Sequence, residues 1–353
     1  MSAQPTRGIT ILRGDIETIA ATAEAAESAG FDTVWTPEFY TRSAIVTLSQ
    51  IAARTRGCRV GTSIAYASGR SPLVLATEAR SLDEVSAGRL VLGLGTGTRR
   101  MMEDWHGIDP AGPATRMEEL VPLLRALWRL HEGPVDHEGR FYRCKITPTA
   151  ETTPGVRDEI PVFTAGVNPR MIEVAGRVAN GLLGHPLFSR QYVDDVVRPA
   201  IRRGLERGDR GKDTIELVGV VICAIAEDSD RARREAAAQL AFYSAPKTYG
   251  PLLDASGFGA AGEEIRAAFA KRDFAAMAGA VPERMVDAMA AAGTAAEVRA
   301  RIDEAAEVFD HVVVYPPSFG LSGARCDELA AALVRELAPP VRELAQQVVG
   351  RDA

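Results

Sequence analysis

The chain has 353 residues and a formal net charge of −6, and 46% of its residues are hydrophobic and 25% charged. This composition is typical of a globular protein with a sizeable core, and its acidic balance argues against non-specific nucleic-acid binding. No apolar run reaches the roughly 18 residues of a membrane span, and the first residues lack a signal-peptide pattern. We therefore expect a cytoplasmic protein that binds a small molecule and neither nucleic acid nor membrane.

Short β-branched runs alternate with longer helical patterns along the chain. The predicted strands are residues 8–12, 33–36, 58–64, 90–94, 160–164, 181–183, 215–225 and 311–315. The predicted helices include residues 15–29, 43–55, 73–86, 116–130 and 326–349. Most strands are short, apolar and followed by a helix, which is typical of parallel strands buried on both faces. About eight such units predict a closed (β/α)8 TIM barrel, with residues 1–353 as a single domain.

Two stretches interrupt this alternation. Residues 135–146 place an acidic-Gly turn between apolar positions, which predicts a hairpin insertion. Residues 244–292 combine helical patterns with Gly and Pro and contain no clear strand, so we expect a helical insertion that forms a lid or a substrate wall. The alanine-rich run 285–300 is expected to be helical, because Ala is the strongest helix former.

The stretch GRLVLGLGTGTRR, residues 88–100, is glycine-rich but lacks the spacing of a dinucleotide or Walker motif. Pro110 and Pro113 also interrupt any clean helix after it. Two interpretations stay open: structural glycines at a tight strand end, or glycines that let backbone approach a flat or phosphorylated ligand. Active sites of barrels lie at the carboxyl ends of the strands. The second interpretation therefore places ligand contacts at Gly95, Thr96, Gly97 and Thr98.

Four segments together resemble the luciferase-like monooxygenase superfamily, in its coenzyme F420-dependent oxidoreductase branch. They are GFD followed by VWTPE, GTSI followed by GRSP, LDEVSAGRLVLGLGTG and TAGVNPRMIEVAGRVANG, and their order covers roughly residues 8 to 320. The resemblance implies a TIM barrel with insertions and a homodimer. It also implies a flavin or the deazaflavin F420 bound at the carboxyl face of the barrel.

The resemblance favours F420 over FMN, which stays the alternative cofactor. In flavin-using relatives the position of Thr96 is often an arginine that holds the FMN phosphate, whereas GLGTG is found in many F420-dependent members. The match to GTSI further implies a cis peptide bond between Ser63 and Ile64, behind the cofactor ring.

The phosphate and acidic tail of F420 require hydrogen-bond donors. Asn168-Pro169 predicts the start of a helix, and a helix N-terminus attracts anions. The expected contacts at two strand ends are Ala165, Gly166, Val167, Asn168, Gly181, Leu182 and Leu183. The arginines that could pair with the carboxylates of the tail are Arg70, Arg99, Arg100 and Arg170.

Three side chains are candidates for proton transfer. Glu38, at the end of the second strand, matches a position that is acidic in many relatives and would also contact the cofactor; the competing interpretation is an ion pair with Arg42. Tyr40 would donate a proton or only pack, and His106 follows the fourth strand. His185, which follows the sixth strand, is a weaker candidate than these three. The remaining side chains of interest are expected to be structural or to line the ring: His131, His137, His311, Trp35 and Trp105.

Departures from relatives bear on the substrate. Phe39 and Thr98 replace the histidine and glutamate of the sugar-phosphate dehydrogenases, and Glu38-Phe39-Tyr40 replaces the E-H-H of the luciferases. We therefore expect hydride transfer between the deazaflavin and another small organic substrate. An FMN-dependent monooxygenase and a non-catalytic barrel that binds a flavin-like ligand are the alternatives. No metal is expected, since four cysteines and five histidines are scattered without an H-x-H pattern.

Overall fold

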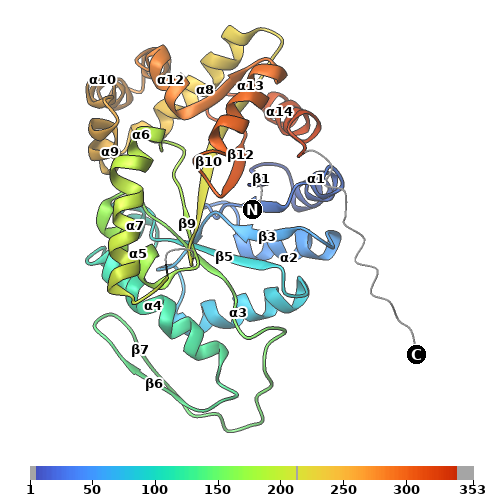
Figure 1. Ribbon diagram of the computed structural model, residues 1–353, viewed down its shortest axis with the longest axis vertical. Helices are drawn as coiled ribbons and strands as arrows, with labels where there is room; N and C mark the ends of the chain where they lie inside the picture. The colour runs from blue at the N-terminus through green and yellow to red at the C-terminus, as the bar shows by residue number, and fades with distance from the viewer. Residues whose placement is uncertain (1–4, 212–213, 340–353) are drawn as a thin grey trace.

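Eight parallel strands close into a barrel in the computed structural model, which describes residues 5–211 and 214–339 (Figure 1). Around the barrel the order is β12, β1, β2, β3, β5, β8, β9 and β10, and pairing of β10 with both β9 and β12 closes it. The bounds are β1 Thr6–Thr10, β2 Thr33–Thr36, β3 Arg59–Thr62, β5 Leu90–Gly95, β8 Val162–Ala165, β9 Gly181–Leu183, β10 Glu216–Ile225 and β12 His311–Tyr315. The predicted (β/α)8 TIM barrel is confirmed.

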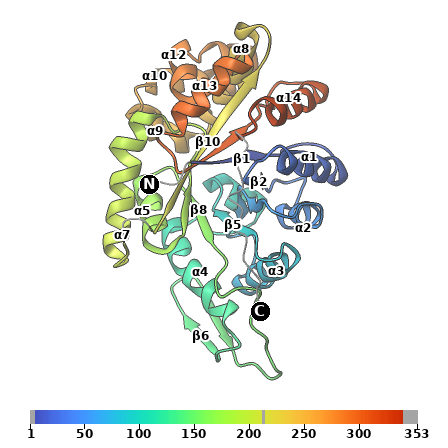
Figure 2. The same cartoon turned by 45° about the vertical axis from the view of Figure 1, so that its right-hand side comes forward.

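Helices surround the barrel, as Figures 1 and 2 show. They are α1 Ile16–Ser28, α2 Ala44–Arg54, α3 Pro72–Val85, α4 Pro113–Trp128, α5 Pro169–Val178, α7 Arg198–Arg207 and α14 Gly323–Glu336, with α6 Arg190–Tyr192, η1 Met101–Trp105 and η2 Val193–Val197 as short turns. Ser43, Ser71 and Ser322 cap their helices by accepting a backbone N–H, which fixes where these helices begin. The predicted last helix, 326–349, begins earlier and ends at Glu336; residues 340–349 lie outside the described residues.

Two further groups of elements lie outside this alternation. The strands β6 Val135–Glu138 and β7 Arg143–Ile146 form an antiparallel hairpin. A lobe at the top of Figure 1 contains α8 Ser229–Ser244, η3 Lys247–Tyr249, α9 Gly250–Ala255, α10 Gly259–Ala270, α11 Phe274–Gly279, α12 Glu283–Met289, β11 Ala290–Gly293 and α13 Ala295–Ala305. That both groups are insertions into a single domain stays a prediction.

The alanine-rich run 285–300 is not one helix, and this prediction was wrong. Its centre forms β11, which pairs in parallel with the outer half of the long β10, from Ile222 opposite Ala290 to Ile225 opposite Gly293. Hydrogen bonding to an available strand outweighs the helix propensity of Ala. The helix restarts at Thr294, whose side chain forms a capping box with Glu297.

The interior of the barrel is filled by side chains from alternate strand positions. This lumen layer consists of Trp35, Val91, Phe163, Leu183, Val218, Val220 and Val313. Trp35 is fully buried, and a Cβ at Gly61 would lie 2.4 Å from its ring, so glycine is required there. Trp35 Nε1 donates to His311 Nε2 (3.3 Å), which leaves Nδ1 of the neutral ring to donate to Thr6 Oγ1 (2.6 Å). The structural role expected for Trp35 and His311 is confirmed.

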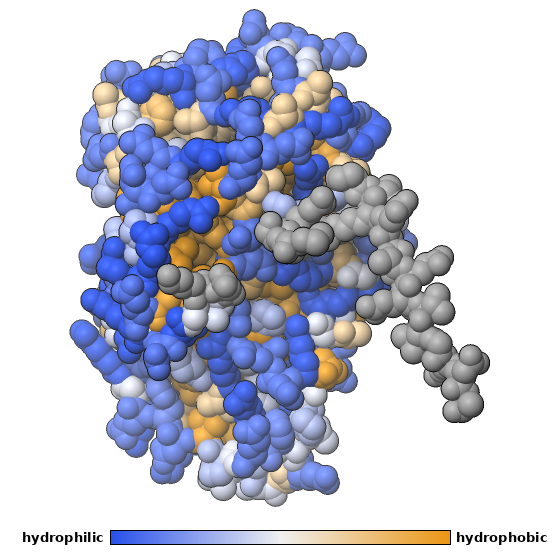
Figure 3. Space-filling view, viewed as in Figure 1, coloured by the Kyte–Doolittle hydropathy of each residue, from blue (hydrophilic) through white to orange (hydrophobic). Residues whose placement is uncertain are grey.

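The Arg59–Glu216 ion pair, with two bonds of 2.9 Å, lies at the amino end of the barrel, where β3 and β10 begin. On the outer face drawn in Figure 3, hydrophilic residues predominate and apolar ones are visible mainly in recessed strips. Within the described part of the chain, no helix has the length and apolar character needed to cross a membrane.

Candidate functional site

The carboxyl mouth of the barrel has a largely apolar floor. Ile64, Ala165 and Tyr315 come from three different strand ends, are partly buried, and pack on the lumen layer. Thr10, two residues after the lumen-facing Gly8, points to the same side of β1. Its Oγ1 is buried and has no hydrogen-bond partner among the described residues. The floor therefore offers apolar contact with at least one free polar atom at its edge.

The glycine-rich strand end is shaped by close packing. A Cβ at Gly93 would lie 1.8 Å from the carbonyl oxygen of Thr62, and one at Gly95 would lie 2.9 Å from the side chain of Ile64. The peptide bond between Ser63 and Ile64 is cis, as the resemblance implied. The strand β4, Ala65–Tyr66, then pairs with the end of β5. The interpretation of structural glycines at a tight strand end is confirmed for Gly93 and Gly95.

Glu38 is held by Arg70. The guanidinium donates to both carboxylate oxygens at 2.7 Å, and the Tyr66 amide donates to Oε2 at 3.0 Å. The side chains of Glu38 and Arg70 are only 9% and 15% exposed. The competing interpretation, an ion pair with Arg42, was wrong: Arg42 instead donates to the carbonyl of Gly14.

The electrostatics of Glu38 follow from these contacts. Burial raises the pKa of Glu38, but hydrogen bonds from Arg70 and Tyr66 and the charge of Arg70 outweigh it, so the pKa lies below its usual value. The same ion pair raises the pKa of Arg70. Glu38 is therefore an ionised hydrogen-bond acceptor near neutral pH.

An aromatic wall, defined as Phe39, Tyr40, Tyr66, Trp105 and His106, rises beside this ion pair. Trp105 makes edge contacts with Phe39 at 5.3 Å and Tyr40 at 5.4 Å, measured between ring centroids. Tyr40 is 72% exposed. His106 packs against Tyr66 at 4.9 Å, and its Nε2 is buried without a hydrogen-bond partner among the described residues. The structure thus brings Glu38, Tyr40 and His106 to one side of the mouth.

The other side of the mouth carries a histidine–tyrosine cluster, defined as His185, Tyr243, Tyr249 and Tyr315. His185 packs on Tyr249 at 4.4 Å and on Tyr243 at 5.1 Å, and Tyr243 donates a hydrogen bond of 2.5 Å to the Tyr315 hydroxyl. The three tyrosines were not among the predicted site residues. Tyr315 could have been placed at the mouth, because it ends a predicted strand. Tyr243 and Tyr249 come from the lobe, and no sequence pattern links them to the mouth.

The predicted helix start at Asn168 is confirmed. The Asn168 side chain accepts from the Met171 amide at 3.0 Å and caps α5. Nearby, Tyr192 donates to the carbonyl of Val167 at 2.5 Å, and a Cβ at Gly166 would collide with Met171. Ala165 to Asn168 therefore form a well-fixed rim segment.

The rim segment after β5 is also fixed by local hydrogen bonds. Thr96 Oγ1 donates to the Gly97 carbonyl at 3.1 Å, and Thr98 Oγ1 accepts from the Met101 amide at 3.3 Å. Gly97 has a φ of +71°, which favours glycine. Thr96 and Thr98 are partly buried and follow the carboxyl end of β5, which places both at the edge of the mouth.

The predicted ligand contacts of Gly181 and Leu182 need correction. Gly181 pairs with Glu216, at the amino end of the barrel, and both Gly181 and Leu182 are buried in β9. Leu183 belongs to the lumen layer. His185 lies two residues after the carboxyl end of β9, at the mouth, where it packs on Tyr243 and Tyr249.

All four candidate arginines have carboxylate partners within the chain. Arg70 contacts Glu38 and Glu78, and Arg170 contacts Glu118 and Glu173. Arg99 and Arg100, which are 78% and 86% exposed, pair with Glu103 and Asp104 on η1. An anionic ligand would therefore compete with exposed ion pairs at Arg99 and Arg100, and with a buried one at Arg70.

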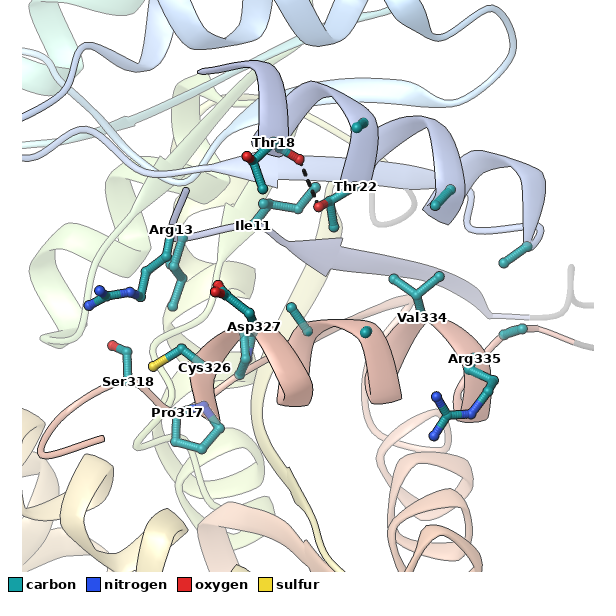
Figure 4. Close-up of a pocket in the computed structure, with 18 residues that line it drawn as sticks. Ile11, Arg13, Thr18, Thr22, Pro317, Ser318, Cys326, Asp327, Val334 and Arg335 are labelled. Atoms are coloured by element: carbon teal, nitrogen blue, oxygen red, sulfur yellow. Dashed lines mark hydrogen bonds between the residues drawn. The ribbon is translucent and has the colours of Figure 1, made fainter. Parts of the chain in front are cut away.

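A separate groove of about 510 Å³ lies between α1 and α14, beside the barrel (Figure 4). Thr18 and Thr22 line one wall and Asp327, Val334 and Arg335 the other, with Arg13 at the end near the rim. Small side chains, including Ala21, Ala25, Ala330 and Ala331, form much of the lining. The groove contains none of the predicted site residues.

Comparisons with known proteins agree with this architecture. The sequence profile of the luciferase-like monooxygenase family matches residues 2–311. An uncharacterized protein of Mycobacterium tuberculosis is 35% identical over 280 residues, which cover 78% of this chain and 82% of that protein. The 5,10-methylenetetrahydromethanopterin reductase of Methanolobus tindarius is 29% identical over 308 residues, covering 86% and 91%. The solved structure of the coenzyme F420 dependent tetrahydromethanopterin reductase from Methanopyrus kandleri superposes with a TM-score of 0.77 at 25% identity, covering 95% and 98%.

Proposed function

Because the chain belongs to the luciferase-like monooxygenase family, we propose that it is a coenzyme F420-dependent oxidoreductase that transfers a hydride between the deazaflavin and a small organic substrate. The names of two relatives, both reductases and one F420-dependent, support this choice. We further propose that the enzyme works in the cytoplasm as a homodimer. Light scattering of the purified protein tests the dimer.

One observation carries the proposal: the mouth combines an apolar floor with unpaired polar atoms at several strand ends. Ile64, Ala165 and Tyr315 offer the flat apolar contact that a tricyclic ring needs. Three buried polar atoms lack hydrogen-bond partners among the described residues: Thr10 Oγ1, His106 Nε2 and the Oγ of Ser68, two residues after β4. We propose that the polar edge of such a ring supplies partners for them. The residues present therefore fit a deazaflavin.

We assign the ring to the segments around Ser63, Ile64 and Gly95. The phosphate and tail would lie along the rim, against the N-terminus of α5 at Asn168 and the backbone of Thr96 to Thr98. When bound, the deazaflavin supplies a ring carbon that donates or accepts a hydride. The chain contributes orientation, exclusion of water and a proton-handling side chain.

We propose that Glu38 positions the site rather than donating a proton. An ionised carboxylate bound by Arg70 and the Tyr66 amide has no proton to give, and it links the end of β2 to the segment that carries Ile64. His106 is the better candidate for proton transfer, because its Nε2 is unpaired in the aromatic wall. Tyr40, which is 72% exposed, is assigned a packing role.

Fluorescence titration of the apoprotein with F420 and, separately, with FMN tests the cofactor. Trp105, 42% exposed in the aromatic wall, reports binding at the mouth, so Trp105→Phe should remove most of the signal. We expect saturable F420 binding and much weaker FMN binding. Tight binding of FMN alone would favour the monooxygenase alternative, and F420 binding without any turnover of reduced F420 would favour the non-catalytic alternative.

A further inference from the structure

The hydroxyl groups of Tyr243 and Tyr315 form a pair with one hydrogen left over. Tyr243 donates to Tyr315 at 2.5 Å, and the two rings lie 6.1 Å apart at 60°. A tyrosine hydroxyl carries a single hydrogen, so this bond uses that of Tyr243. The hydrogen of Tyr315 has no acceptor among the described residues. This hydrogen of the partly buried Tyr315 is therefore available to a bound ligand.

The free donor lies at the mouth. Tyr315 is the last residue of β12 and packs on the lumen layer together with Ile64 and Ala165, the proposed floor for the ring. Tyr243 comes from α8, in the lobe above this end of the barrel. The pair therefore joins the floor of the site to the lobe that covers it.

The surroundings of the pair are electrically neutral. Burial raises the pKa of Tyr315 and Tyr249 to about 12 and that of Tyr243 well above its usual value. Burial lowers the pKa of His185 to about 3, and its Nδ1 accepts from the Leu187 amide, so the ring is neutral with its hydrogen on Nε2. A neutral donor in such surroundings suits an uncharged acceptor, because an anion would lose its hydration without gaining a cation.

We propose that the Tyr315 hydroxyl, oriented by Tyr243, is the hydrogen-bond donor that holds an uncharged acceptor atom of the substrate, a carbonyl oxygen or its hydroxyl counterpart, in the barrel mouth. This inference rests on the proposed function and names the substrate class that the site takes. Tyr243 is a positioning residue: it fixes the Tyr315 hydroxyl, and by donating to it makes Tyr315 a stronger donor.

Infrared spectroscopy of a bound ketone tests the donor directly. The probe is acetophenone with a ¹³C-labelled carbonyl, added to the protein with oxidised F420 and without it. A hydrogen bond from Tyr315 lowers the carbonyl stretching frequency relative to the probe in an alkane. Tyr315→Phe should return the frequency toward the alkane value and weaken acetophenone binding about fivefold, the loss of roughly one neutral hydrogen bond.

Two matched variants make the test selective. Tyr243→Phe should give a smaller change of both quantities, because the donor remains but is less well oriented. Tyr142→Phe removes a partly buried hydroxyl on the hairpin and should leave both unchanged. The proposal is overturned if the wild-type protein does not bind acetophenone saturably or does not shift its carbonyl frequency. It is also overturned if Tyr315→Phe leaves that frequency unchanged, or if Tyr243→Phe weakens acetophenone binding more than Tyr315→Phe does.

F420 titration of each variant separates this inference from the proposed function. If F420 fails to bind the wild-type protein, the proposed function is wrong, whatever the ketone shows. If F420 binds all variants equally and the carbonyl frequency does not respond to Tyr315→Phe, only the role of Tyr315 is wrong.

Discussion

The guanidinium of Arg70 spans both carboxylate oxygens of Glu38, with two hydrogen bonds of 2.7 Å. Glu38 follows β2, whereas Arg70 and Tyr66, which also donates to this carboxylate, follow β3. The Glu38 amide in turn donates to the carbonyl of Ile64 at 3.0 Å. One carboxylate thus fixes two neighbouring strand ends at the position where the proposed cofactor ring would lie.

Glu38→Gln should weaken F420 binding about tenfold and slow the turnover of the F420-saturated enzyme less than that. The amide cannot hold both ends of the Arg70 fork, so the Ile64 segment loses its support, at a cost of about 1–3 kcal/mol in stability. Fluorescence titration and steady-state kinetics measure the two effects. Glu103→Gln, which removes an exposed pair with Arg99, is the control and should cost less than about 1 kcal/mol. Lost turnover with unchanged F420 affinity would instead assign Glu38 to proton transfer.

Gly93→Ala should reduce the free energy of unfolding by about 3 kcal/mol or more. The new Cβ would lie 1.8 Å from the backbone oxygen of Thr62, and backbone cannot move aside as a flexible side chain does. Gly279→Ala is the control: nothing lies within 4 Å of its Cβ, so stability should stay equal or rise by up to ~1 kcal/mol. Urea unfolding compares the two. Equal stability of Gly93→Ala and the wild-type protein would contradict the close packing.

Removing one partner of the buried ion pair of Arg325 and Glu235 should lower the free energy of unfolding strongly, whereas replacing both partners by apolar residues should lower it little. The two side chains are 7% and 8% exposed and make bonds of 2.9 and 2.8 Å. Glu235→Leu leaves a buried guanidinium short of a partner and should cost about 3 kcal/mol, whereas adding Arg325→Met should recover most of this loss. Denaturant unfolding of the single and double variants measures the recovery.

The exposed carboxylate of Glu283, which pairs with Arg233, provides the comparison for the buried pair. It is 79% exposed, so Glu283→Gln should change stability by less than about 1 kcal/mol. A double variant at positions 235 and 325 that is no more stable than Glu235→Leu would show that the pair is needed for packing rather than for charge compensation.

Stability should fall as the pH drops from about 6.5 toward 5. Burial lowers the pKa of His311 from its usual 6.5 to about 3, so in this window the unfolded chain binds a proton that the folded one does not. The expected slope is on the order of 1 kcal/mol per pH unit. Glu38 and Glu216 also have lowered pKa values, but their contribution to stability is lost only at pH values below about 4.5.

His311→Gln should flatten this slope, because glutamine keeps polar atoms near Thr6 and Trp35 but binds no proton. His185, whose pKa burial also lowers to about 3, should account for part of the slope that remains. Urea unfolding between pH 5 and 7 measures the change. An identical slope in His311→Gln would contradict the assignment.

Much of the fold could be predicted from local sequence. The sequence placed the strand TVWT at Thr33–Thr36 and HVVVY at His311–Tyr315, as observed. A short apolar run bounded by helix caps and glycines favours a buried strand over other structures. Local sequence failed at Ala290–Gly293, where an unpaired stretch of β10 provides hydrogen bonds that outweigh the preference of alanine for helix. It also failed at Gly181: the strand 181–183 was placed correctly, but Gly181 is its first residue and lies at the amino end of the barrel.

The candidate site was only half predictable. Glu38, Tyr40 and His106 follow strands and so could be placed at the mouth, but the partner of Glu38 could not. Arg42, four residues on, was the nearest choice in sequence, whereas Arg70 is brought there by the next strand of the barrel. Tyr243 meets Tyr315 across 72 residues, and no local pattern encodes that contact.

The sequence by itself determined the alternation of strands and helices and the polar residues at the strand ends, since both follow from side-chain periodicity and backbone preference within a few residues. Only the tertiary structure decided which of these residues share an ion pair, which hydroxyl keeps a free hydrogen, and which glycines face a neighbouring backbone. Those outcomes depend on ångström-scale distances between segments far apart in the chain, which exist only once the barrel has closed.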